Sequence, residues 1–167
     1  MSSGQATSAY IAAKLGSLLG KTVHYHGFLP RERVLDMLRT ARVAVFPSFS
    51  EAFALAPIEA MARGCATIFT KLSSGPELIE DGQTGLLVGP HQPQEISDAL
   101  IRVLRDDHLA ARLGAQARKH VEAELCIKAI VTKNISFYES CNARFRPEKT
   151  LRQATIPSHV FNTNRIS

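Results

Sequence analysis

The hydrophobic positions along this chain follow two patterns, helical spacing and short runs rich in apolar residues. Helical spacing predicts helices over 8–19, 31–41, 57–63, 76–79, 93–105, 108–123 and 127–139. Short apolar runs bounded by turn residues predict strands over 23–29, 43–46, 66–70 and 85–88. The run over 43–46 contains no polar residue, as expected for a strand that helices cover on both faces.

The order of these elements indicates the fold class. Strands that alternate with helices are typical of βαβ units, so the sequence predicts an α/β, Rossmann-like domain with a parallel sheet. In such an open sheet, ligands bind at the carboxyl ends of the strands. Three loops leave these ends, over 27–30, 47–56 and 70–76, and we expect them to converge on one rim.

The segment from Pro47 to Gly64 carries the strongest candidate chemistry. It leads from a strand through a turn into a helix, with Pro57 near the helix start and Gly64 as the residue that ends it. Free N–H groups at a helix start lie at the positive end of the helix dipole and suit a phosphate. Glu51 and Glu59 flank this start. Their carboxylates would repel a phosphate, but they suit the hydroxyls of a nucleotide-sugar.

Length and charge divide the chain into two parts. The 167 residues, 45% hydrophobic and 21% charged, are typical of one soluble domain with a sizeable core. The tail over 141–167 holds five of the twenty basic residues and a single acid, Glu148, so the remaining residues are nearly neutral. We therefore predict a folded domain over 1–140 and a basic, disordered tail over 141–167. This distribution does not favour nucleic acid as a partner, but it leaves peripheral contact with a membrane open.

The cysteines and the N-terminus indicate the compartment. Cys65, Cys126 and Cys141 are widely spaced, which excludes a disulfide framework and gives no zinc spacing. Cys65 precedes a buried-looking strand and is interpreted as a small hydrophobic residue. No apolar run approaches the ~20 residues that span a bilayer. The N-terminus does not resemble a secretory signal, so we expect a cytoplasmic location, with the inner face of a membrane left open.

Several segments in this order resemble one known family. They are Gly27-Phe28, Ala41-Arg42-Val43, Pro47-Ser48, the stretch from Glu51 to Gly64, Gly75-Pro76-Glu77-Leu78-Ile79, and the stretch from Asp81 to Val88. Together they resemble the C-terminal half of a retaining GT-B glycosyltransferase of group 1, also called family 4. The resemblance implies a domain that binds a UDP-, GDP- or ADP-sugar and, when complete, transfers a hexosyl group with retention of configuration. It implies no metal or other cofactor.

The resemblance also implies roles for individual residues. Glu51 matches the catalytic acid that contacts the transferred sugar, and Glu59 matches the acid that holds the ribose hydroxyls. The remaining donor-binding positions are the backbone that cradles the diphosphate, at Phe53, Ala54 and Leu55, and the turn that meets the base, at Phe28 and Leu29. No protein nucleophile is required, because the leaving diphosphate helps to take the proton from the acceptor hydroxyl. The protein must then stabilise the charge on that leaving group.

Three further residues have weaker claims to the site, each beside an ordinary alternative. Ser50 is a turn residue or a sugar contact, Lys71 is a solvated loop residue or a phosphate contact, and Glu77 caps a short helix or lies near the pocket. His24 and His26 have a spacing that can hold a metal, but no third ligand is evident. The arginines over 31–42 are interpreted as the solvated face of a helix.

The sequence departs from the family in two ways. Ala52 and Ala54 stand where the family usually has Gly or another small residue, with Gly common at the position of Ala54. Alanine is also small, but compared with glycine it limits positive φ and adds a methyl group near the ligand. The family's two preceding strands, with their Arg–Lys segment, and its acceptor domain have no counterpart here. We therefore expect either a donor-binding domain that works with a separate N-terminal domain or chain, or a truncated, non-catalytic remnant or interaction module. A flavodoxin-like or receiver-like domain is disfavoured, because no early acidic cluster or phosphate loop is present.

Overall fold

The structure is a computed structural model that describes residues 3–145, and it describes side chains from residue 8 onward. The chain divides into two compact units between Cys126 and Ile127. This division falls earlier than the boundary predicted at residue 140. The two units are described separately below.

The first unit is built around a parallel sheet. Its strands β1 (Val43–Phe46), β2 (Ala66–Thr70) and β3 (Leu86–Val88) lie in the order β1-β2-β3. Every residue of the central strand β2 is buried. The bounds of β1 and β2 agree with the sequence prediction, and β3 begins one residue later than predicted.

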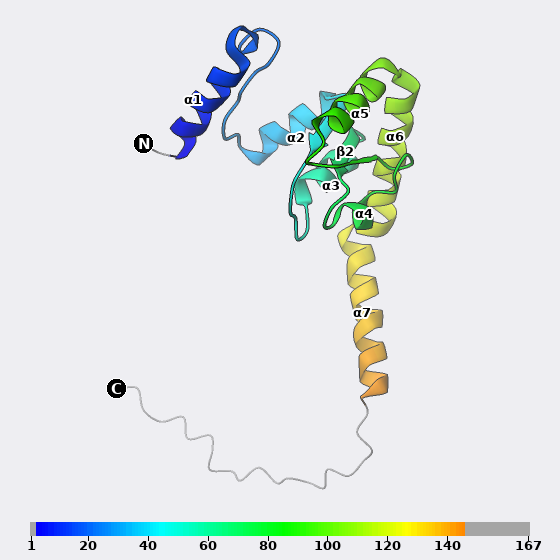
Figure 1. Ribbon diagram of the computed structural model, residues 1–167. Helices are drawn as coiled ribbons and strands as arrows, with labels where there is room; N and C mark the ends of the chain where they lie inside the picture. The colour runs from blue at the N-terminus through cyan, green and yellow to red at the C-terminus, as the bar shows by residue number, and fades with distance from the viewer. Residues whose placement is uncertain (1–2, 146–167) are drawn as a thin grey trace, which may run out of the picture. The chain divides into compact units, whose positions relative to one another are not determined.

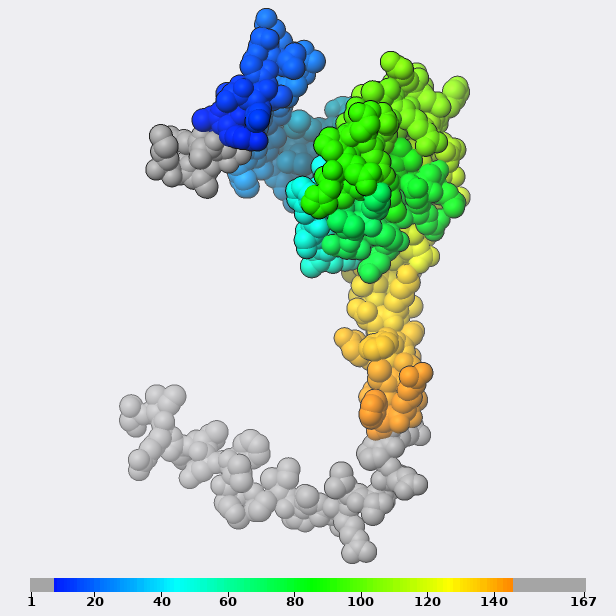
Figure 2. Space-filling model, in the orientation of Figure 1, coloured from blue at the N-terminus to red at the C-terminus, as the bar shows by residue number. Residues whose placement is uncertain are grey.

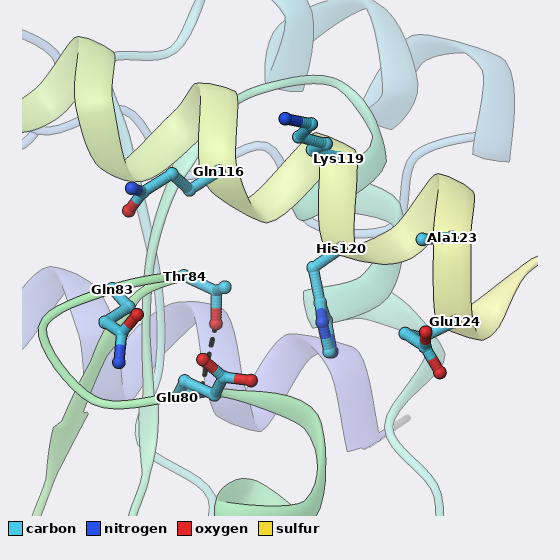
Figure 3. A pocket seen from close by; sticks show the side chains of 8 residues that line it. All are labelled: Glu80, Gln83, Thr84, Gln116, Lys119, His120, Ala123 and Glu124. Atoms are coloured by element: carbon cyan, nitrogen blue, oxygen red, sulfur yellow. Dashed lines mark hydrogen bonds between the residues drawn. The ribbon is translucent and has the colours of Figure 1, made fainter.

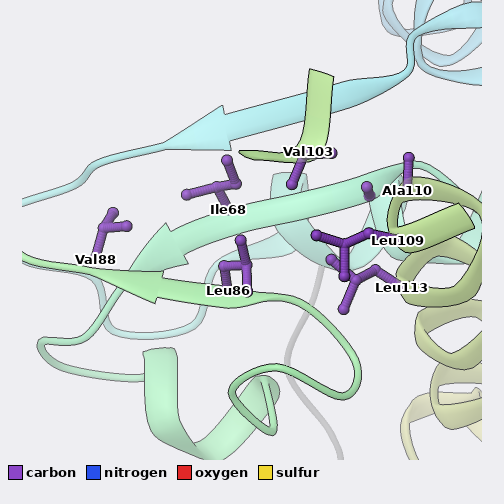
Figure 4. Packing of buried hydrophobic residues seen from close by; sticks show 8 residues of the cluster. Ile68, Leu86, Val88, Val103, Leu109, Ala110 and Leu113 are labelled. Atoms are coloured by element: carbon purple, nitrogen blue, oxygen red, sulfur yellow. The ribbon is translucent and has the colours of Figure 1, made fainter. Parts of the chain in front are cut away.

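Helices cover both faces of this sheet (Figure 1). On one face, Ile68 of β2 packs with Val103 of α5 (Pro93–Arg105) and Leu113 of α6 (Asp107–His120), as Figure 4 shows. In the space-filling view, the bright green residues of α5 form part of the surface that faces the viewer (Figure 2). On the other face, Phe69 packs with Met61 of α3 (Leu55–Ala62) and with residues of α4 (Gly75–Leu78). The α/β class is therefore confirmed, and double coverage explains why β2 is buried throughout.

The remaining elements of the first unit are α1 (Ser3–Leu15), the 3₁₀-helix η1 (Gly16–Leu18), α2 (Arg31–Thr40) and η2 (Val121–Leu125), which is a π-helix. Helix α2 packs against α3 through a third cluster that contains the buried Cys65. Burial raises the pKa of the Cys65 thiol to about 11, which agrees with its interpretation as an unreactive hydrophobic residue.

The predicted strand over 23–29 is wrong. This segment forms only a single bridge, between Leu19 and Val23, and its Phe28 side chain is 98% exposed. A strand is stabilised by a hydrogen-bonded neighbour, and within residues 3–145 the sheet consists of β1, β2 and β3 alone. The loop over 27–30 therefore does not leave the end of a sheet strand. Of the three loops predicted to form the rim, the two over 47–56 and 70–76 leave the ends of β1 and β2.

The second unit begins with α7 (Ile127–Arg144), a helix with no buried side chain. The helix was predicted over 127–139, so it continues past the predicted domain boundary at residue 140, and residues 141–144 of the predicted disordered tail are helical. The rest of that tail, from residue 146, lies outside the described residues. Across the described part of the chain, no helix is long and apolar enough to cross a membrane.

Candidate functional site

The connection from β1 to α3 forms the centre of the candidate site. It leaves the carboxyl end of β1 after Phe46 and enters α3 at Leu55, two residues before the predicted start. The residue before the helix, Ala54, provides no side-chain cap. The first N–H groups of α3 therefore have no side-chain acceptor from their N-cap, which leaves them suited to an anionic ligand. Pro57 is buried as the third helical residue, and the helix ends before Gly64, whose φ of 74° matches its predicted role.

Glu51 lies in this connection and is half-buried. Its Oε1 atom accepts a hydrogen bond of 2.9 Å from the hydroxyl of Ser48, three residues earlier. This bond fixes one carboxylate oxygen from within the same turn. It fits the sequence prediction that Glu51 belongs to the turn, and it adds Ser48 as the residue that orients it.

Glu59 lies in the middle of α3, and its side chain is 25% exposed. The guanidinium of Arg31, the first residue of α2, donates to its Oε1 atom from Nε at 2.8 Å and lies 2.6 Å from it through Nη2. Arg31 was interpreted as part of a solvated helix face, together with other arginines of that stretch. No local pattern indicates its pairing with Glu59, because the two residues are 28 positions apart and meet only when α2 packs on α3.

The backbone at the helix start accommodates alanine without strain. Ala54 has φ −85° and ψ 99°, and within the described residues Ser73 is the only non-glycine residue with positive φ. The two alanines that replace the family's small residues therefore do not force an unfavourable backbone conformation. The methyl group of Ala54 is buried, whereas the Phe53 and Leu55 side chains are exposed at 53% and 64%. Phe28 is exposed and Leu29 is half-buried near the start of α2, and no contact places either at this site.

Lys71, the first residue after β2, is paired with a residue that the sequence analysis did not single out. Its Nζ atom lies 3.1 Å from Oε2 of Glu95 on α5, and the same oxygen accepts a 3.0 Å hydrogen bond from the N–H of Gly89. These bonds, first from Gly89 and then from Lys71, lower the pKa of Glu95 below its ordinary value of 4.5. Lys71 is therefore engaged in linking β2 to α5.

We expect Lys71→Ala to raise the pKa of Glu95 part of the way toward 4.5, because the Gly89 hydrogen bond remains. A carboxyl whose pKa is lowered by folding stabilises the folded state above its unfolded pKa, and that contribution is lost as pH falls through the folded pKa. Carbon-detected NMR titration of the Glu95 carboxyl in both proteins measures the effect. An identical pKa in the variant would show that Lys71 does not interact with Glu95 in solution.

The other two candidates are exposed. Ser50 lies in the β1–α3 connection, and Glu77 lies in α4, where its backbone N–H donates to the carbonyl of Ser74. Neither side chain has a contact that assigns it to the site. The ring centroids of Phe49 and His91 lie 4.7 Å apart with their planes tilted by 44°, and this contact joins the β1–α3 connection to the segment after β3.

A separate pocket of about 620 Å³ lies between the loop after α4 and the helices α6 and η2 (Figure 3). Glu80, Thr84, Gln116 and His120 are among its lining residues, and the Thr84 hydroxyl accepts a hydrogen bond from the N–H of Glu80. None of the predicted site residues lines it. His24 and His26 have ring centroids 6.4 Å apart, and within the described residues no three His, Cys, Asp or Glu side chains are grouped to hold a metal.

Comparisons with known proteins define the class of the chain. The model of the family "Glycosyl transferases group 1" matches residues 4–120. A D-inositol 3-phosphate glycosyltransferase of Streptomyces griseus is 36% identical over 113 residues, which cover 68% of this chain and 24% of that protein. The chain belongs to the group 1 glycosyltransferase family, and it corresponds to a C-terminal part of such proteins.

Solved structures agree with this assignment. Sucrose-phosphate synthase from Thermosynechococcus elongatus superimposes with a TM-score of 0.71 at 30% identity, covering 83% of this chain and 35% of that one. The C-terminal domain of a group 1 family protein from Francisella tularensis gives 0.68 at 28%, covering 76% of this chain and 66% of that one. Anabaena HepE, solved in complex with UDP, gives 0.69 at 22%, over 86% of this chain and 38% of that one, and supports the fold.

These matches show a GT-B glycosyltransferase fold. The chain spans about a quarter of the length of the curated relatives that it matches. Activities of those whole proteins therefore enter only as proposals for this chain.

Proposed function

We propose that the first unit binds a nucleotide-diphosphate sugar as the donor domain of a retaining hexosyltransferase. The observation that carries this proposal is the position of two oriented carboxylates around the uncapped start of α3. Glu51 precedes the helix by four residues, Glu59 follows its first residue by four, and each has one oxygen fixed by a neighbour. Because the chain belongs to the group 1 glycosyltransferase family, we assign this arrangement to sugar transfer.

Each part of the proposed site has a role that its chemistry supports. The N–H groups near Phe53, Ala54 and Leu55 donate to the diphosphate and stabilise its charge as it leaves. Glu59 accepts hydrogen bonds from the ribose, and Glu51 contacts the transferred sugar. Phe28 and Leu29 meet the base. No side chain acts as a nucleophile, and no metal takes part.

The acceptor is bound by a separate domain or chain in this proposal, and the reaction takes place in the cytoplasm or at the inner face of a membrane. The donor is a UDP-, GDP- or ADP-sugar. Uridine nucleotides are the first to test, because Anabaena HepE was solved with UDP and with UDP-glucose. A chain that binds none of these nucleotides would instead be the non-catalytic remnant considered above.

We expect Glu59→Ala to weaken binding of the preferred nucleotide-sugar by about 10- to 100-fold. Hydrogen bonds to a charged group contribute about 1.5–3 kcal/mol, and 1.4 kcal/mol corresponds to a factor of ten. Isothermal titration calorimetry with UDP-, GDP- and ADP-glucose measures the affinities of the two proteins.

Glu139→Ala is the matched control, because it removes one exposed glutamate from α7, in the second unit. This control should bind as the unaltered protein does. Equal affinities for Glu59→Ala and the unaltered protein would contradict the assignment of Glu59 to the donor site.

A further inference from the structure

Arg31 contacts Glu59 in an unsymmetrical way. Both of its contacts, from Nε at 2.8 Å and from Nη2 at 2.6 Å, are made to the same carboxylate oxygen, Oε1. A structural ion pair between these groups commonly takes the bidentate form, with one donor on each oxygen. Here Oε2 of Glu59 has no hydrogen-bond partner among residues 3–145.

This geometry contributes little to folding. The Arg31 side chain is 72% exposed, and exposed ion pairs are worth about 0–1 kcal/mol because solvent screens them and the side chains lose entropy. Its main physical effect is on orientation, since the hydrogen bond from Nε and the ion contact from Nη2 both fall on Oε1 and restrict rotation of the carboxylate about its terminal bond. Oε2 is then held in one direction while it remains able to accept hydrogen bonds.

The pair also changes the local charge. A lone carboxylate at the position of Glu59 would repel a diphosphate bound at the start of α3. The guanidinium of Arg31 offsets that charge at contact distance, and it does so without occupying the second oxygen. A carboxylate with a paired charge and one available acceptor is suited to a vicinal diol, which offers two neutral hydroxyl donors.

We propose that Arg31 is the positioning residue of the ribose subsite: it holds Oε1 of Glu59 so that Oε2 accepts from the ribose hydroxyls of the donor. This inference rests on the proposed function, because it requires that Glu59 meets the ribose. It adds a residue outside the motif that identifies the family, and it assigns that residue its main effect at the ribose.

The test compares ribonucleotides with analogues that lack the ribose hydroxyls. Affinities for UDP, GDP and ADP, and for their 2′,3′-dideoxy counterparts, are measured by calorimetry for the unaltered protein and for Arg31→Ala. We expect Arg31→Ala to weaken binding of the preferred ribonucleotide about 10-fold more than binding of its dideoxy analogue, because the analogue loses only the charge compensation and the ribonucleotide also loses the oriented acceptor. Arg31→Lys should restore part of the discrimination, because an ammonium can also donate to Oε1.

Two controls separate positioning from general effects. Arg39→Ala removes an exposed arginine from the same helix, one that pairs with Asp36, and should change neither affinity. In the Glu59→Ala background, Arg31→Ala should cause no further loss of discrimination, because the carboxylate that it orients is gone. Thermal unfolding of each variant verifies that the proteins remain folded.

The failures of the two proposals are distinguishable. If the unaltered protein prefers ribonucleotides and Glu59→Ala removes that preference, but Arg31→Ala does not, the role of Arg31 is refuted and the donor site stands. If Arg31→Ala lost the same factor of affinity for the ribonucleotide and for the dideoxy analogue, Arg31 would act only through its charge. That result would also refute its role in positioning Glu59. If the unaltered protein binds no nucleotide, both proposals fail.

Discussion

A Gly114→Ala substitution is expected to destabilise the first unit by about 3 kcal/mol, although the same change usually stabilises a helix. Alanine is favoured over glycine in a helix interior by about 1 kcal/mol. Gly114 lies in α6, and a Cβ atom built on it would overlap the backbone carbonyl oxygen of Gly64, just after α3. A backbone carbonyl cannot rotate away as a side chain does, so α3 and α6 would have to separate, and overpacking of this kind costs about 1–3 kcal/mol or more.

The position of Gly64 makes this close approach difficult to relieve. Its φ of 74° belongs to the left-handed region, and its N–H donates to Met61 at the end of α3. Moving its carbonyl would disturb the helix end and the entry into the buried strand β2.

Urea unfolding followed by circular dichroism measures the Gly114→Ala effect. Ala111→Gly, at an exposed position of the same helix, is the control for propensity alone and should lower the free energy of unfolding by about 1 kcal/mol. If Gly114→Ala were as stable as the unaltered protein, α3 and α6 could not be in contact at this point.

The elements that the sequence predicted well are those whose own residues determine them. The run over 43–46 is apolar, and the run over 66–70 is apolar apart from two threonines, because helices cover both faces of the sheet; the bounds of both runs agree with β1 and β2. The segment over 23–29 was also predicted as a strand and is not one. Strand formation there depends on a neighbouring strand, and the residues of the segment contain no information about whether that neighbour is present.

In the candidate site, too, the features within one local stretch of sequence were predictable and the contacts between distant segments were not. Glu51 and Glu59 could be found from their spacing around a predicted strand-to-helix turn, because both lie within one local motif. Their partners follow different rules: Ser48 is a near neighbour of Glu51, whereas Arg31 reaches Glu59 only through the packing of α2 on α3. Lys71 was considered for phosphate binding, but its pairing with Glu95 across the connection from β2 to α5 could not be inferred from sequence.

The close approach of Gly64 and Gly114 was also outside the reach of sequence patterns. Gly64 was predicted as the residue that ends α3, which its dihedral angle confirms. Gly114 interrupts an otherwise regular helical pattern, and nothing in that pattern distinguishes a required glycine from a tolerated one. The requirement comes from a second helix at backbone contact distance.

The second large effect is expected for Phe69→Ala, which should lower the free energy of unfolding by about 3–5 kcal/mol. The Phe69 side chain is 0% exposed, and it packs from the central strand onto α3 and α4. Removal of the ring deletes contacts with elements on that entire face and leaves a cavity that the regular backbone of β2 cannot collapse to fill. Domains have total stabilities of about 5–15 kcal/mol, so a substantial fraction of the variant would be unfolded at moderate temperature.

Phe137→Ala is the matched control for Phe69→Ala, since it removes the same ring from α7, where the side chain is 62% exposed. Chemical unfolding of both variants should show a loss for Phe69→Ala that exceeds the loss for the control by at least about 2 kcal/mol. Similar losses would contradict burial of β2 against α3. Because α3 carries Glu59, the same Phe69→Ala protein should also lose nucleotide affinity as the temperature approaches its lowered unfolding midpoint, whereas Glu59→Ala should lose affinity while it remains folded.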